Sequence, residues 1–106
     1  MKPKIGLVYL NRNAEGILPV QQFINSYKAF APGVEHELII IYKGFSSGEL
    51  GRAKELFKDI EHRNLIVDDH LTDIDSYLFS VKSLPNIDVF CFLNTFSQSS
   101  LHWETI

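Results

Sequence analysis

The polar residues that follow the apolar runs of this sequence are its best candidates for chemistry. Residues 89–93 form a wholly apolar run, and the run stops abruptly at Asn94, Thr95 and Ser97. This pattern is typical of a buried parallel strand at its carboxyl end. Because ligands of open α/β sheets bind outside the carboxyl ends of the strands, these side chains stand where a hydrogen-bonding site is expected. The segment holds no carboxylate, which a metal-dependent reaction would need.

Three more polar clusters follow apolar or helical segments: Asn11 to Asn13, the Gly/Ser loop at 44–48, and the acidic residues 68–70 with their histidine. The loop at 44–48 opens a helix, whose free N–H groups suit a phosphate. Residues 68–70 have the side chains of metal ligands. Each cluster also has a purely structural reading, because Asn and Gly form turns and loop residues at strand ends are usually solvated.

Between these clusters, short apolar runs alternate with segments in which apolar residues recur at helical spacing. Four apolar runs predict strands at 5–10, 37–42, 65–67 and 89–93. Helical spacing predicts three helices at 20–30, 50–60 and 74–84, and residues 98–106 begin a further one. Residues 31–33 (Ala-Pro-Gly) end the first helix, and Thr72 or Asp73 is the N-cap of the third.

Strands that alternate with helices imply parallel pairing and right-handed crossovers. The predicted fold class is therefore α/β: a three-layer, Rossmann-like, mostly parallel sheet of four strands with helices on both faces. The runs at 37–42 and 89–93 are apolar at every position but their ends, so we expect both strands to be covered on both faces. We expect one domain over residues 1–106.

Composition excludes several classes of protein. The chain is 45% hydrophobic and 22% charged, which is ordinary for a globular domain. A net charge of -3 and a pI near 5.7 argue against a nucleic-acid partner. No apolar run approaches the roughly 20 residues of a membrane helix, and the run at 5–10 is too short for a signal peptide, so we expect a cytoplasmic protein. The single cysteine, Cys91, excludes an internal disulfide and suits the core.

Residues 9–12, 43–46, 73–77 and 90–94 together resemble the N-terminal, nucleotide-binding half of a GT-A glycosyltransferase. Residues 9–12 are similar to the segment that packs on the base after the first strand of that family. Residues 43–46 are similar to the turn after its second strand. Residues 73–77 and 90–94 are similar to the helix and strand that lead to its metal-binding Asp-x-Asp motif. The resemblance spans the whole chain and implies a sheet order of third, second, first and fourth strand.

The resemblance implies a site for a nucleotide-sugar donor. Asn11 and Arg12 would contact the nucleotide, Tyr42 would line the base or ribose pocket, and Asn94 would lie nearest the diphosphate. Asp73 is either a further contact with the donor or a helix cap. No catalytic residue is assigned, because the acceptor-binding half of the family has no counterpart in residues 1–106. We therefore expect that this chain transfers no sugar by itself.

No cofactor is assigned either. Asn94 and Phe96 stand where the family has two metal-ligating carboxylates, so we do not expect bound Mn²⁺ or Mg²⁺. A neutral amide oxygen binds such a cation more weakly than a carboxylate does, and phenylalanine cannot ligate at all.

A second hypothesis is a non-catalytic binding or interaction module, either on a flavodoxin- or receiver-like fold or as a remnant of the GT-A fold. A receiver needs acidic residues where this chain has Asn11 and Arg12. No Ser-His-Asp order, P-loop or Gly-x-Gly-x-x-Gly motif is present. We also expect apolar surface near Phe90, Phe92 and Leu101 to stay uncovered, which predicts a homodimer.

Overall fold

The computed structural model describes residues 3–29 and 35–94. The four strands are β1 (Ile5–Arg12), β2 (His36–Lys43), β3 (Arg63–Val67) and β4 (Val89–Asn94). The helices are the short 3-10 helix η1 (Asn13–Glu15) and the α-helices α1 (Leu18–Ala29), α2 (Ser47–Glu55) and α3 (Asp73–Ser83). The helix end expected at 31–33, the further helix expected at 98–106 and Leu101 lie outside the described residues.

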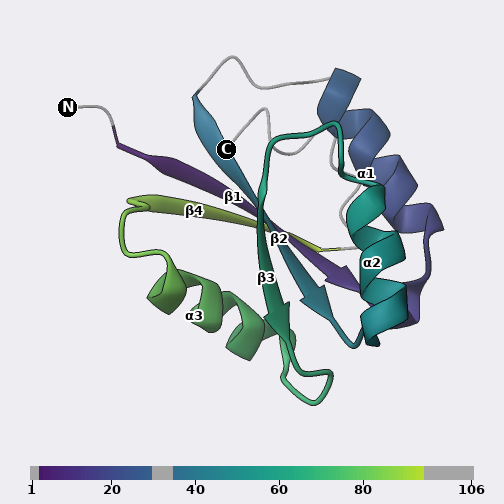
Figure 1. Ribbon diagram of the computed structural model, residues 1–106. Helices are drawn as coiled ribbons and strands as arrows, with labels where there is room; N and C mark the ends of the chain where they lie inside the picture. Colours follow the sequence, from purple (N-terminus) through teal and green to yellow (C-terminus); the bar gives the residue numbers. More distant parts are fainter. Residues whose placement is uncertain (1–2, 30–34, 95–106) are drawn as a thin grey trace.

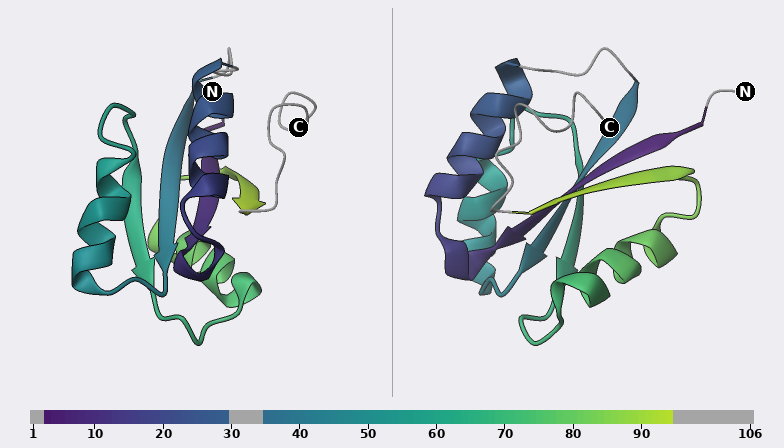
Figure 2. Two further views of the ribbon diagram at one scale, coloured as in Figure 1. Left: turned by 90° about the vertical axis from the view of Figure 1, so that its right-hand side faces the viewer. Right: turned by 180° about the vertical axis from the view of Figure 1, so that it is seen from behind.

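The four strands form one parallel sheet in the order β3-β2-β1-β4 (Figure 1). Helices α1 and α2 cover one face of this sheet and α3 covers the other, as the turned views make clear (Figure 2). The chain runs outward from β1 to β2 and β3, then crosses the sheet to place β4 on the other side of β1. The predicted α/β class and strand order are both confirmed.

The core has two layers because successive strand residues point to opposite faces of the sheet. On the α1–α2 face, Leu7 and Tyr9 of β1 lie beside Leu38 and Ile40 of β2. The α3 face holds the alternate residues of the same strands, listed here: Val8, Leu10, Ile39 and Ile41, each fully buried. Both inner strands are therefore apolar on both faces, which the second apolar run predicted.

Strand β4 departs from that prediction. It is an edge strand that pairs only with β1 among the described residues, and Phe92 and Val89 are 40% and 44% exposed. The expectation that this run is covered on both faces is wrong. Complete burial within the described part of the chain therefore does not explain the apolar composition of β4.

Two element boundaries also differ from the predicted ones. Strand β1 continues through Asn11 and Arg12, because β2 offers pairing partners up to Tyr42 and Lys43. Helix α2 ends at Glu55 rather than near residue 60. Successive turns after Glu55 still bury Phe57. The helical spacing of apolar residues up to residue 60 therefore indicated which residues are buried, but not a continuous helix. No described helix is long and apolar enough to span a membrane.

Candidate functional site

The carboxyl ends of β1, β2 and β4 meet at one edge of the sheet. The chain leaves β1 toward α1 on one face, whereas β4 enters beside β1 from α3 on the opposite face. A crevice between such diverging connections is the usual ligand site of an open α/β sheet. Ser46 and Thr72 begin the helices that border this edge, since each hydroxyl accepts a hydrogen bond from the backbone N–H three residues on.

Asn11 is the most unusual residue at this edge. Its side chain is 1% exposed, yet neither its Oδ1 nor its Nδ2 atom has a hydrogen-bond partner among the residues that the structure describes. Buried polar groups in native proteins are nearly always paired, and an unpaired one costs about 1–3 kcal/mol of stability. The Asn11 amide therefore lowers the stability of the free protein, and a ligand could offset that loss by pairing with it.

Two tyrosines are neighbours of Asn11 in the sheet. Asn11 is the register partner of Tyr42, and Tyr9 precedes it on the same face of β1. The hydroxyls of Tyr9 and Tyr42 are both buried and have no hydrogen-bond partner within the described residues. Burial raises the pKa of each phenol well above its ordinary value, with a further rise at Tyr9 from the Glu15 carboxylate. Both phenols are therefore neutral at physiological pH and retain a proton to donate.

A cavity of about 230 Å³ adjoins Asn11 on the α1–α2 face. Phe45 forms part of its wall and packs edge-to-face on Tyr42, with ring centroids 5.7 Å apart. Asn13 also lines it, and its amide Nδ2 donates to the Gly44 carbonyl at 3.1 Å, which ties the turn after β1 to the loop after β2. The remaining lining residues are Gly16, Ile17, Val20, Glu49, Arg52, Ala53 and Leu56. An aromatic wall above a buried amide suits a flat, polar ring.

Glu49 and Arg52 bring charge to this cavity from helix α2. Hydrogen bonds lower the pKa of Glu49: the largest contribution is the backbone N–H of Ser46, followed by the side chains of Ser46 and Asn13. Neither Glu49 nor Arg52 was among the candidates from the sequence. The Ser46-x-x-Glu49 capping pattern was a usable signal for the first, and Arg52 lies one turn further along the same helix.

Other predicted site residues lie on the α3 face. Lys43 is 5% exposed, and its Nζ lies 3.7 Å from the Asp73 carboxylate at the start of α3. Arg12 pairs in register with Lys43, and strand alternation sets it on the same face. One Arg12 nitrogen, Nη1, lies 3.4 Å from Glu15, whereas its buried Nε has no partner. Two cations therefore neighbour each other at the carboxyl ends of β1 and β2, each with one carboxylate partner.

The five residues predicted to bind a nucleotide thus fall into separate groups. Asn11 and Tyr42 lie together under α1 and α2, and Arg12 and Asp73 lie toward α3, beside Lys43. The Thr72 hydroxyl supplies the cap of α3, so Asp73 is the first helical residue and an ion-pair partner instead of the cap. Asn94 ends β4 as the register partner of Leu10, on the other side of β1.

Thr95, Phe96 and Ser97 lie outside the described residues. The acidic cluster after β3 does not gather ligands for a metal: His70 and Asp68 are exposed and 4.0 Å apart, and Asp69 packs beside Gly44. Within residues 3–29 and 35–94, no three His, Cys, Asp or Glu side chains are grouped so as to hold a metal ion.

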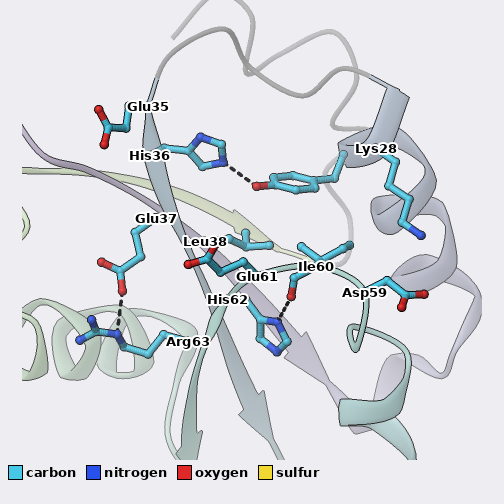
Figure 3. A pocket seen from close by; sticks show the side chains of 11 residues that line it. Lys28, Glu35, His36, Glu37, Leu38, Asp59, Ile60, Glu61, His62 and Arg63 are labelled. Atoms are coloured by element: carbon cyan, nitrogen blue, oxygen red, sulfur yellow. Dashed lines mark hydrogen bonds and ion pairs between the residues drawn. The ribbon is translucent and has the colours of Figure 1, made fainter.

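A larger hollow of about 960 Å³ lies at the opposite end, beside the start of β2 and β3 (Figure 3). Four of its polar side chains form two pairs, whereas His62 Nε2 is buried with no hydrogen-bond partner among the described residues. The Tyr27 hydroxyl and His36 Nε2 are 2.6 Å apart, and Arg63 donates to Glu37 at 2.7 Å. His62 Nδ1 lies 2.6 Å from the Ile60 carbonyl. Because this hollow lies at the amino ends of the strands, whereas ligands of open α/β sheets bind at the carboxyl ends, the smaller cavity is the better candidate.

Comparison of the chain with family models, with curated proteins and with solved structures gave no match in any of the three. The cavity beside Asn11 and its side chains are therefore the basis for assigning a function.

Proposed function

We propose that this chain is a nucleotide-binding domain of the glycosyltransferase-like kind, which holds the base of a nucleotide in the cavity beside Asn11. The observation that carries the proposal is the Asn11 side chain, which is 1% exposed and has no partner for either amide atom within residues 3–29 and 35–94. An amide presents a donor beside an acceptor and can pair with the complementary edge of a base. Phe45 supplies an aromatic wall of the cavity.

The size of the cavity limits what it holds. Pockets for whole drug-sized ligands measure about 300–1,000 Å³, so a cavity of about 230 Å³ takes a single ring system. The ribose and phosphates would then project over the carboxyl edge of the sheet. Arg12 and Lys43 lie at that edge and offer the positive charge that phosphates need. Protein cations in this position would bind a diphosphate without a divalent metal.

The direct test is an amide chemical-shift titration with UDP and with uridine, each in Mg²⁺ and in EDTA. We expect shifts at Asn11, Tyr42 and Phe45, tighter binding of UDP than of uridine, and equal affinity in both buffers. Shifts confined to the hollow around His36 and His62 would refute the site, and no shift at millimolar UDP would refute nucleotide binding.

Two variants assign the contact. Asn11→Leu removes both amide atoms at nearly constant shape and should abolish the shifts. Asn64→Leu makes the same change at an exposed position of β3 and should leave them intact. Equal binding by both variants would show that the Asn11 amide does not contact the ligand.

Binding and catalysis are separable in this proposal. We expect the chain to bind nucleotide yet release no sugar from a panel of sugar nucleotides, because no three His, Cys, Asp or Glu side chains among the described residues are grouped so as to hold a catalytic metal. Sugar release above that of a heat-inactivated control would show that the chain is an active enzyme.

A further inference from the structure

Helix α3 carries its apolar side chains on the side that faces away from the sheet. Its two fully buried residues are Ser76 and Ser80, and their hydroxyls donate to backbone carbonyls of the same helical turn at 3.0 and 2.6 Å. By contrast, Ile74, Leu78 and Val81 are 70%, 52% and 40% exposed. A helix that only covered a sheet would show the reverse pattern.

The exposed residues form one continuous surface. Ile74, Leu78 and Val81 recur at the spacing of one helix face, and Tyr77 lies at its flank. The Tyr77 ring packs on Phe92 of the edge strand β4 with centroids 4.5 Å apart, and Phe92 is itself 40% exposed. We call Ile74, Leu78, Val81 and Phe92 the α3–β4 surface. Contiguous apolar patches of this kind usually mark an interface.

The charges beside this surface indicate what it binds. Asp75 and Lys82 lie on the same flank of α3, two turns apart. Asp75 precedes Leu78 by three residues and Lys82 follows it by four. If a second α3 packed antiparallel with Leu78 at the centre, each Asp75 would meet the Lys82 of the other helix. Ile74 would likewise meet Val81, so the surface is complementary to itself.

We propose that the α3–β4 surface is the interface of a homodimer, in which two α3 helices pack antiparallel about a two-fold axis near Leu78. Such an interface is isologous, so one patch supplies both sides. Opposite charges on one flank favour the antiparallel pair, because in a parallel two-fold pair the flanks that carry Asp75 and Lys82 would lie on opposite sides of the interface and these ion pairs would be lost. An 11-residue helix is only about 16 Å long, so Phe92 must add to the buried area. The expected dimer is weak, with a Kd of roughly 1–100 μM.

The test is sedimentation equilibrium of the full chain across that concentration range. We expect the wild type to shift from monomer to dimer mass, and Leu78→Glu to remain monomeric. The matched control is Leu18→Glu at the start of α1, where leucine is 61% exposed and far from α3 along the chain. It should associate like the wild type.

Charge reversal tests the geometry separately. Asp75→Lys alone and Lys82→Glu alone should each weaken the dimer at least tenfold, whereas the double variant should recover most of the wild-type affinity. Amide spectra should show that every variant is folded. These charge variants decide the question even if Leu78→Glu fails to fold. A wild type that stays monomeric at high micromolar concentration overturns the proposal, as does equal weakening by Leu78→Glu and Leu18→Glu. Failure of the double variant to recover affinity overturns the antiparallel arrangement.

Discussion

Replacement of Asn11 by leucine should stabilise the free protein while it abolishes ligand binding. The Asn11 amide is 1% exposed, and neither of its polar atoms has a hydrogen-bond partner in the described part of the chain. Leucine has the same branching at Cγ and carries no group that must be solvated. The substitution removes a penalty of the folded state and adds apolar burial at a site that already lies beside Val20 in the cavity lining.

The magnitude follows from the cost of an unpaired buried polar group, about 1–3 kcal/mol. We expect the free energy of unfolding to rise by roughly 2 kcal/mol, which corresponds to a Tm increase of about 10 °C for a domain of this size. The exposed Asn64 amide is already in water, so Asn64→Leu should change stability by no more than about 0.5 kcal/mol.

The assay is urea unfolding followed by circular dichroism, with the slope of the transition checked for constancy. A gain in stability together with lost UDP binding would show that the amide is kept for a ligand at the expense of the fold. Destabilisation of Asn11→Leu by more than about 1 kcal/mol would mean that the amide is satisfied in solution, by ordered water or by other residues of the chain, and would refute the reasoning.

Three further predictions concern Gly44, the N-cap of α2 and the four tyrosines. Gly44→Ala should lower the free energy of unfolding by about 1–3 kcal/mol, because Gly44 has a φ of 80° and a Cβ there would lie 2.8 Å from the Asp69 carboxylate. Urea unfolding measures this loss of stability, and an unchanged urea midpoint would contradict the prediction. Ser46→Ala should cost about 1 kcal/mol through loss of the capping box of α2, with Ser47→Ala, one residue past the cap, as the neutral control. Alkaline pH should destabilise the fold, because burial raises the pKa of Tyr77 to about 12 and raises the pKa of the other three tyrosines. Their neutral forms then contribute stability that is full below pH 10 and is lost as the pH rises past it. Absorbance at about 295 nm should show no tyrosine that ionises near its reference pKa of about 10 in the folded protein.

The fold could be predicted from the sequence because alternation of apolar runs and helical spacing leaves few topologies open. The site could be predicted only in part. Asn11 and Arg12 were expected at the polar end of a strand, but pairing with β2 draws both into the sheet and sends their side chains to opposite faces. The local sequence pattern cannot reveal where β1 ends, because the end of β1 depends on where the neighbouring strand β2 ends.

Helix α3 shows a different limit. Its apolar spacing predicted the helix, but the residues that meet the sheet are Ser76 and Ser80, whose hydroxyls bond within the helix and so cost little when buried. Periodicity identifies an apolar face without saying which partner covers it. The direction of that face depends on how closely α3 approaches the strands, and only the three-dimensional structure gives this.

The strand order has a consequence for how the chain folds. Strand β1 lies between β2 and β4, and its pairing with β4 joins residues that are some 84 positions apart, as in the bond from the Lys4 amide to Asp88. The unit β1-α1-β2-α2-β3 can form from nearer contacts, but until β4 arrives one edge of β1 has unpaired backbone groups along its most apolar stretch. Closing so long a loop is slow, and an open apolar edge invites pairing with other chains. The docking of β4 is therefore the step at which folding competes with aggregation, so conditions that slow it should lower the yield of refolded protein before they lower the stability of the native state.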